Sequence, residues 1–215
     1  MMARLAAEFF GTMLLLAVIT GSGIMGESLS VGNPAVALLG NSLATGAGLY
    51  VLITVLAPIS GAHFNPVVSF MFWKIRELDG RYLLPYFVSQ IVGGVIGIWV
   101  THLMFGLPVF QFSTKYRGSL GMFFSEFLST LVLLSVIFLG SRSKKMCVAC
   151  LVALAVMAGY WFTSSTFFVN PAVTIARAFT DTFVGINPQQ ILPFIACQFA
   201  AAIMVLVIIS LSTKD

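Results

Sequence analysis

The chain has 215 residues, of which 59% are hydrophobic and 8% are charged, and its formal net charge is +4 at pH 7. A composition this apolar lies outside the range of soluble domains and is typical of proteins that cross a membrane several times. The small positive charge does not indicate a nucleic-acid-binding face, because Lys and Arg occur in short clusters between apolar stretches. We therefore expect a multi-pass membrane protein with no nucleic-acid partner.

A helix that spans the hydrocarbon core needs roughly 20 mainly apolar residues. In chain order, the segments that meet this requirement are about 5–24, 34–57, 81–105, 120–140, 145–164 and 189–211. Two further apolar stretches, from Pro66 to about Lys74 and from Pro171 to about Thr180, would cover only roughly 12–15 Å as helices. Irregular backbone at membrane depth is tolerated only inside protein or beside a wet cavity. These stretches therefore predict two re-entrant half-helices in an all-α membrane fold with six transmembrane helices.

The basic residues predict the orientation of the chain. With a cytoplasmic N-terminus, only Lys115, Arg117 and Arg177 fall on the external side. The residues then placed on the cytoplasmic side are Arg4, Lys74, Arg76, Arg81, Arg142, Lys144, Lys145 and Lys214. We expect both termini on the cytoplasmic side of a plasma or inner membrane, and half-helices that enter from opposite faces.

The chain also repeats itself. AEFFGTMLLL at 7–16 opens one half and SEFLSTLVLL at 125–134 opens the other, and each half later reaches an Asn-Pro pair and a half-helix. Each half contains three full spans, an odd number, so the second copy is inverted in the membrane. We expect one domain over 1–215 with inverted halves of about 1–113 and 114–215.

Four Asn-Pro pairs divide into two kinds. Asn is a good N-cap and Pro a good first helical residue, so Asn33 and Asn187, which precede full-length helices, predict ordinary helix starts. Asn65 and Asn170 cap helices too short to span. Their side-chain amides are therefore predicted to lie at membrane depth, in a pore.

These motifs resemble those of a known family. SGAHFNPVVSF and FVNPAVTIARAF, with the paired openings AEFFGT and SEFLST, are similar to the major intrinsic proteins, which comprise the aquaporins and aquaglyceroporins. The resemblance covers nearly the whole chain and implies a homotetrameric channel with one pore per subunit, no enzymatic activity and no cofactor or metal. The second signature, Asn170-Pro171-Ala172, follows the family, whereas the first reads Asn65-Pro66-Val67 where the family usually has Ala.

The predicted pore chemistry follows from the half-helices. Two positive N-termini that meet at the midplane repel cations and orient water oppositely on either side, which opposes proton hopping. Asn65 and Asn170 would offer amide donors there, and His63 could add a further donor. The backbone carbonyls expected to form a ladder of acceptors belong to Gly61, Ala62, His63, Ser165, Thr166 and Phe167. Such a pathway favours water and small neutral hydroxyl compounds over ions.

Two glutamates, Glu8 and Glu126, fall inside predicted spans, where a carboxylate is costly and usually functional. The resemblance implies that they lie behind the pore and brace the loops that carry the Asn-Pro pairs. A proton relay or cation binding is the alternative.

The narrowest part of the pore differs from that of most relatives. The family usually carries Arg directly after the second Asn-Pro-Ala, and this chain has Val173. An ungapped count places the other filter positions at Thr45, Ala158 and Phe167, which gives a wide filter without fixed charge. Arg177 lies one turn further on and is expected to cap the half-helix or to pair with Asp181, in preference to the alternative that it substitutes in the filter.

A filter with Phe is similar to that of the glycerol-conducting branch, and Val with Thr on the second helix is similar to a bacterial branch associated with arsenic handling. The expected function is passive permeation of glycerol and neutral metalloid hydroxides, such as arsenite or methylated arsenicals, with some water. A water-selective aquaporin is the alternative, and a coupled transporter or a structural membrane protein are alternatives of another class. Cys147, Cys150 and Cys197 do not form a metal-binding pattern.

Overall fold

The computed structural model describes residues 1–143 and 145–212 and has an all-α membrane fold. Lys144 and Lys214, which the sequence places on the cytoplasmic side, lie outside the described residues. In chain order the elements are α1 (Met2–Leu29), α2 (Pro34–Ser60), α3 (Pro66–Lys74), η1 (Gly80–Tyr82), α4 (Leu83–Met104), α5 (Leu120–Ser141), α6 (Val148–Phe162), α7 (Pro171–Arg177), η2 (Pro188–Gln190) and α8 (Ile191–Ser212).

Each predicted span corresponds to a helix, with α1 longer and α6 shorter than predicted. Five of them form helices long and apolar enough to cross a membrane. The segment 145–164 forms only the 15-residue helix α6, which extends about 22 Å, because the extended backbone of Cys147 and Thr163 bounds it on either side. The half-helix α3 has the predicted bounds, whereas α7 ends at Arg177 instead of Thr180, where Phe179 closes a tight turn onto Ala176.

All four Asn-Pro asparagines begin a helix in the same way. In each, the side-chain oxygen accepts a hydrogen bond from the backbone N–H two residues further on, at 2.9 to 3.1 Å. The predicted helix starts at Asn33 and Asn187 are therefore confirmed. Because Pro at the first helical position needs no hydrogen-bond acceptor, the pair fixes the start of a helix even when it is short.

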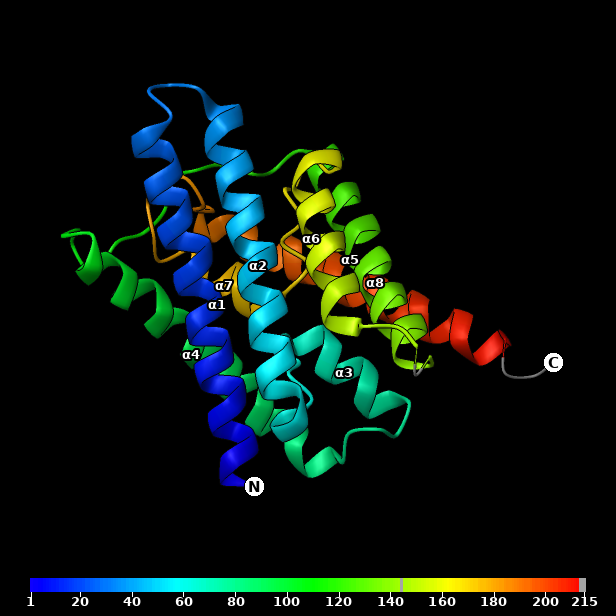
Figure 1. Cartoon of the computed structure of the whole chain (residues 1–215). Helices are drawn as coiled ribbons and strands as arrows, with labels where there is room; N and C mark the ends of the chain where they lie inside the picture. Colours follow the sequence, from blue (N-terminus) through cyan, green and yellow to red (C-terminus); the bar gives the residue numbers. More distant parts are fainter. Residues whose placement is uncertain (144, 213–215) are drawn as a thin grey trace.

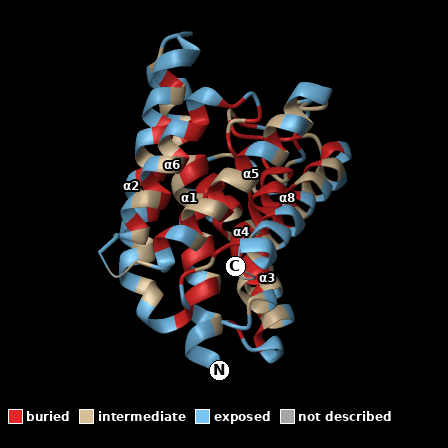
Figure 2. Ribbon diagram, turned by 90° about the vertical axis from the view of Figure 1, so that its right-hand side faces the viewer, coloured by how far each residue is buried: buried red, intermediate tan, exposed pale blue. Residues whose placement is uncertain are grey.

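The two half-helices lie between the long helices. Helix α1 packs against α2 and α4, α2 packs against α6, and α5 packs against α6 and α8. Both α3 and α7 contact α4 and α8, and they also contact each other, so they occupy the interior of the bundle (Figure 1). Buried residues face this interior while the outward faces of the long helices are exposed (Figure 2), as expected of helices that meet lipid.

Helices α1 and α4 approach closely at two glycines. A Cβ atom at Gly93 would overlap the backbone carbonyl of Phe9, and one at Gly97 would overlap the carbonyl of Met13. Small residues four apart let transmembrane helices pack backbone to backbone. The small-residue spacing in α4 therefore fixes the distance between α4 and α1.

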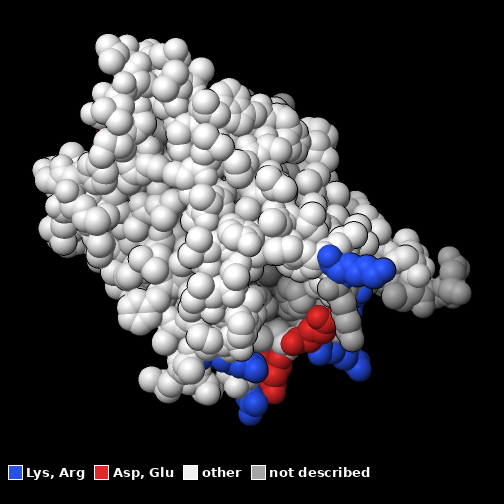
Figure 3. Space-filling model, viewed as in Figure 1, with Lys and Arg blue, Asp and Glu red and all other residues white. Residues whose placement is uncertain are grey.

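Charged side chains on the face shown in Figure 3 gather at the end of the molecule where α1 begins. Two ion pairs involve the segment between α3 and α4: Arg81 with Asp79 at 3.2 Å and Arg142 with Glu77 at 2.7 Å. The remainder of this face is almost free of charge, as the surface of a membrane-embedded helix bundle should be.

Candidate transport pore

The two re-entrant loops are joined by the asparagines that cap their half-helices. The carboxamide nitrogen of Asn65 donates to the carbonyl oxygen of Val169 at 2.8 Å. That of Asn170 donates to the carbonyl oxygen of Phe64, also at 2.8 Å. Each carboxamide has two N–H donors, so one remains after the cross-loop bond. Both asparagines line the same internal cavity, where the second donor can meet a solute.

The first loop is held from behind by Glu8, which is fully buried in α1. One carboxylate oxygen accepts hydrogen bonds from the Ser60 hydroxyl at 2.6 Å and the His63 backbone N–H at 3.0 Å. The other accepts from the Phe64 backbone N–H at 2.7 Å and the Gln90 side chain at 2.8 Å. Four donors converge on one carboxylate, which offsets the cost of burying it.

Glu126 in α5 holds the second loop in a related way. Its carboxylate accepts from the Val169 backbone N–H at 2.5 Å and from the Gln198 side chain at 2.7 Å. Gln198 also donates to Thr174 on α7, as Gln90 donates to Ser69 on α3.

These two glutamines, Gln90 and Gln198, escaped the sequence analysis. The signal was available, because each is the only amide side chain within its apolar helix, α4 or α8. A single buried amide needs a polar partner, and here the partner is a glutamate of the same half.

The backbones of both loops are irregular where they line the cavity. Left-handed φ values occur at Gly61, Ala62, Phe64, Thr166, Phe167 and Val169. Gly61, Ala62 and His63 line the cavity, as predicted for the first loop.

In the second loop the lining residues are Phe167 to Asn170, and the predicted Ser165 and Thr166 are not among them. The backbone N–H of Ser165 instead donates to the Ser125 hydroxyl at 3.3 Å, and the Thr166 hydroxyl accepts from Arg117. The part of the second loop that lines the cavity therefore begins at Phe167, two residues later than the predicted start at Ser165.

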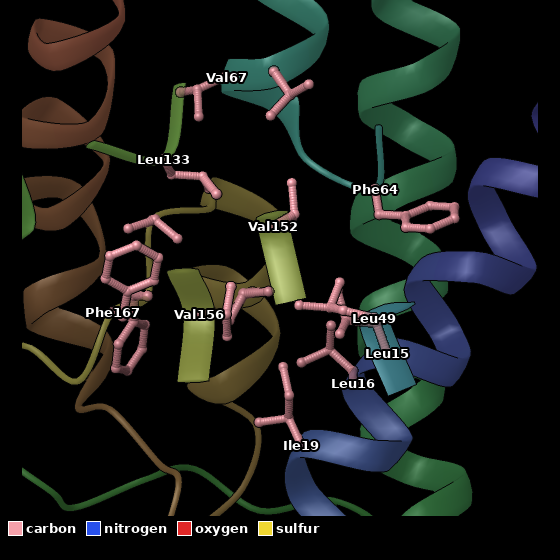
Figure 4. Packing of buried hydrophobic residues seen from close by; sticks show 14 of the residues in the cluster. Leu15, Leu16, Ile19, Leu49, Phe64, Val67, Leu133, Val152, Val156 and Phe167 are labelled. Atoms are coloured by element: carbon pink, nitrogen blue, oxygen red, sulfur yellow. The ribbon is translucent and has the colours of Figure 1, made fainter. Parts of the chain in front are cut away.

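The cavity has a volume of about 270 Å³ and an apolar wall. Side chains four residues apart on α1, α2, α5 and α6 converge on it, and several of them, including Leu15, Leu49, Leu133, Val152 and Val156, are seen in Figure 4. It extends from Ser141 and Val148 at one end, past both asparagines, to Tyr160 and Arg177 at the other. The polar groups available to a solute are thus concentrated along the two loops and at the Arg177 end.

Three of the four predicted filter residues line this cavity: Thr45, Phe167 and Val173. Ala158 does not, because it is exposed on the outer face of α6. The inner face of α6 carries Val152, Val156 and Tyr160, spaced by four residues. The ungapped count across the loop therefore selected the wrong face of the helix.

Tyr160 is a cavity residue that the sequence analysis missed. Its hydroxyl lies 3.3 Å from the hydroxyl of Thr45, where α6 packs against α2 beside the cavity. The sequence contained a signal for it, because Tyr160 continues the four-residue spacing of Val152 and Val156 along one face of α6. The pair places two hydroxyls, each able to donate and accept, beside Phe167 and Val173.

The expectation that Arg177 caps α7 or pairs with Asp181 is wrong. The side chain is buried, and its Nε donates to the carbonyl oxygen of Val184 in the segment after α7. Asp181 instead accepts from the backbone and hydroxyl of Thr114. Arg177 is among the residues that line the cavity.

Two further side chains were singled out by the sequence. The ring of His63 stacks on Phe72 at 4.9 Å, and its Nδ1 lies 3.0 Å from the Ser69 hydroxyl. Cys147 is exposed and accepts a hydrogen bond from the backbone N–H of Cys150 at the start of α6. The first residue belongs to the cavity wall and the second acts as a helix cap.

A helical membrane fold in which two half-helices meet at an internal cavity defines a channel-type protein. The chain belongs to the major intrinsic protein family, whose sequence profile matches residues 1–166. This family consists of membrane channels and is not enzymatic.

Individual relatives agree with this assignment. The chain is 43% identical to aquaglyceroporin AqpS of Rhizobium meliloti over 203 residues, which cover 94% of this chain and 87% of that protein. It is 29% identical to the glycerol uptake facilitator protein of Haemophilus influenzae over 54% of this chain and 42% of that protein. The X-ray structure of the aquaglyceroporin from Plasmodium falciparum superposes with a TM-score of 0.74, at 22% identity, over 95% of this chain and 93% of that one, and supports the fold.

Proposed function

We propose that the protein is a passive, bidirectional channel for small neutral solutes. The solutes are glycerol and neutral metalloid hydroxides of similar size, including arsenous acid and methylated arsenicals, with water as a lesser passenger. The observation that carries this proposal is the wall of the cavity, which is mainly apolar. Its polar groups belong to the two loops, to the asparagine amides, to the hydroxyls of Thr45 and Tyr160, and to Ser141 and Arg177 at the two ends.

A solute that crosses such a cavity must replace its water shell with groups on the wall. The loops supply carbonyl acceptors and the asparagines supply donors, so a molecule with several hydroxyls can be satisfied at each step. Its carbon skeleton meets the apolar side chains of Phe167 and Val173, which add no fixed charge to the wall. The names of the two relatives, an aquaglyceroporin and a glycerol uptake facilitator, support the same solute class.

Coupled transport is less well supported. A coupled transporter needs a titratable or ion-binding group on the substrate pathway. Glu8 and Glu126 are fully buried, and neither is among the residues that line the cavity. Both carboxylate oxygens of Glu8 and one carboxylate oxygen of Glu126 accept hydrogen bonds from backbone or side-chain donors, which suits a brace better than a proton carrier.

We also propose a homotetramer with one pore per subunit, cytoplasmic termini and inverted halves of about 1–113 and 114–215. The tetramer has support in the membership of the chain in the major intrinsic protein family. The orientation has support in the charge distribution of Figure 3.

Stopped-flow light scattering on proteoliposomes tests the solute class. Osmotic shrinkage reports water flux, and re-swelling reports the entry of glycerol or arsenous acid. Val173→Arg should lower glycerol re-swelling by about tenfold, since the side chain enters the cavity beside Phe167 and narrows it. Val173→Thr, of nearly the same shape and without charge, is the matched control. Rapid water flux in the wild type without any solute flux would make the protein a water-selective channel and overturn the proposal.

A further inference from the structure

Arg177 occupies an unusual position for a buried cation. It lies four residues after Val173 and therefore on the same face of α7, about 6 Å further along the helix. Only 3% of the residue is exposed, yet it contributes to the wall of the cavity. A fixed positive charge thus lies one turn beyond the place where the family usually carries its arginine.

The contacts of Arg177 orient the guanidinium, and no ion pair with a described residue is among them. Nε is used by the Val184 carbonyl, and the carbon of the guanidinium lies 3.5 Å from the centre of the Phe168 ring. Among residues 1–143 and 145–212, neither terminal nitrogen makes a hydrogen bond, and no carboxylate lies within ion-pair distance. Four N–H donors consequently remain for groups that enter the cavity.

A second arginine lies beside the same aromatic ring. Arg117, in the segment between α4 and α5, is half-buried, and its guanidinium carbon is 5.4 Å from the centre of the Phe168 ring. Its Nε donates to the Gly185 carbonyl at 2.9 Å, and one terminal nitrogen reaches the Thr166 hydroxyl at 3.5 Å. Bonds to the loop backbone from both arginines hold two like charges around one ring, although like charges repel.

A purely structural role would not require this arrangement. Arg177 does tie the segment after α7 to the helix through Val184. A single backbone carbonyl could be satisfied by a neutral donor, however, and a buried charge that is only attracted by Glu126 and makes no ion pair with a described residue is costly. The positive charge itself therefore needs an explanation, and its place in the cavity wall offers one.

We propose that Arg177, with Arg117 beside it, is the charge-selective element of the pore, displaced one helical turn from the usual filter position. Its terminal N–H groups bind the hydroxyl oxygens of neutral solutes, and its charge repels protons, metal ions and organic cations before they reach Thr45 and Tyr160. This inference rests on the proposed function as a neutral-solute channel. It also explains how a filter with Val173 can be wide for polyols and still closed to cations.

The test compares a neutral solute with a cation of the same shape. Urea and guanidinium are planar and nearly equal in size, so their fluxes into proteoliposomes differ chiefly through charge. Proton leak is followed with an entrapped pH-sensitive dye under a potassium and valinomycin clamp. The variants are Arg177→Gln, which is neutral, Arg177→Lys, which keeps the charge, and Arg117→Gln. Arg142→Gln, at the other end of the molecule, is the matched control for loss of one positive charge.

Arg177→Gln should raise guanidinium and proton flux by about tenfold, the effect of one unit charge acting over roughly 10 Å at an effective dielectric constant of about 20. Arg177→Lys and Arg142→Gln should match the wild type in cation flux, and Arg117→Gln should give a smaller rise than Arg177→Gln. Equal cation flux in wild type and Arg177→Gln, at equal amounts of incorporated protein and with glycerol still conducted, would overturn the inference.

Two further measurements test the proposal independently of Arg177→Gln. If Arg177→Gln does not fold, the cation flux of Arg117→Gln tests the proposal. Guanidinium and proton flux in Arg117→Gln equal to that of the wild type would overturn it. The wild type provides the second measurement. If it conducts guanidinium as fast as urea, the proposal is overturned without any mutation. Absence of glycerol flux in the wild type would instead count against the proposed function, so the two failures are distinguishable.

Discussion

Asn65 donates its side-chain amide to the backbone carbonyl of Val169 at 2.8 Å, and so ties the cap of one half-helix to the loop that leads into the other. The two residues are more than a hundred positions apart in the sequence. One side chain therefore starts a helix, joins the two halves of the chain and faces the cavity.

The first prediction concerns this triple role. Asn65→Ala should destabilise the folded protein by about 2–4 kcal/mol, from the lost N-cap and the orphaned Val169 carbonyl together. Asn33→Ala removes a cap at the exposed start of α2 and should cost only about 1 kcal/mol. Thermal unfolding in detergent, read by circular dichroism, compares the two. Equal losses would mean that the cross-loop bond contributes nothing.

The second prediction concerns the buried carboxylates. Glu8→Gln replaces an acceptor of four hydrogen bonds with a group that has one acceptor oxygen and an NH₂ facing existing N–H donors. We expect a loss of about 2–4 kcal/mol and a lower folded yield, because buried donors lose their acceptor. Glu77→Gln, where the carboxylate is partly exposed in an ion pair, should change stability by less than about 1 kcal/mol.

The same variant separates bracing from proton relay. A brace predicts no new current in planar bilayers that contain Glu8→Gln or Glu126→Gln. A proton or cation conductance in either variant would show that the carboxylate controls ion passage and would contradict the bracing role.

The third prediction concerns the contact between α1 and α4. Gly97→Ala places a Cβ atom on the backbone carbonyl of Met13, which has no room to move within the helix. We expect destabilisation of about 1–3 kcal/mol or more, the usual cost of overpacking. Gly40→Ala in α2 is the matched control, since nothing lies within 4 Å of its added Cβ. It should stabilise the protein by up to about 1 kcal/mol through helix propensity. Identical melting temperatures for the two variants would contradict the close packing.

The sequence predicts much of this fold because the relevant signals are local. A run of about nine apolar residues after Asn65 and Pro66 is bounded by a cap at one end and by charges at the other, and α3 has those bounds. Helix length, N-caps and the small residues of α4 can likewise be identified within a few turns. The family motifs add the arrangement of halves that local signals do not supply.

Part of the site depends on geometry that such signals do not carry. Between Thr163 and Asn170 the backbone visits the left-handed region three times, so residues cannot be counted across the loop as if it were regular. This is why Ala158 was selected in place of Tyr160. The position of the Arg177 side chain depends on its contacts with Phe168, before α7, and with Val184, after α7. The sequence does not show that Val184 folds back to reach Arg177.

The last prediction tests the corrected filter on α6. Tyr160→Phe removes a hydroxyl 3.3 Å from that of Thr45 and keeps the ring, so it deletes one polar group from the cavity wall. A hydrogen bond worth about 0.5–1.5 kcal/mol corresponds to a change in glycerol flux of about two- to tenfold, measured by stopped-flow re-swelling. Ala158→Leu adds bulk at the position the sequence count selected, but this residue is exposed on the outer face of the helix. Its glycerol flux should stay within about twofold of the wild type, since no added atom enters the cavity. A strong effect of Ala158→Leu with none from Tyr160→Phe would restore the original count and remove Tyr160 from the pathway.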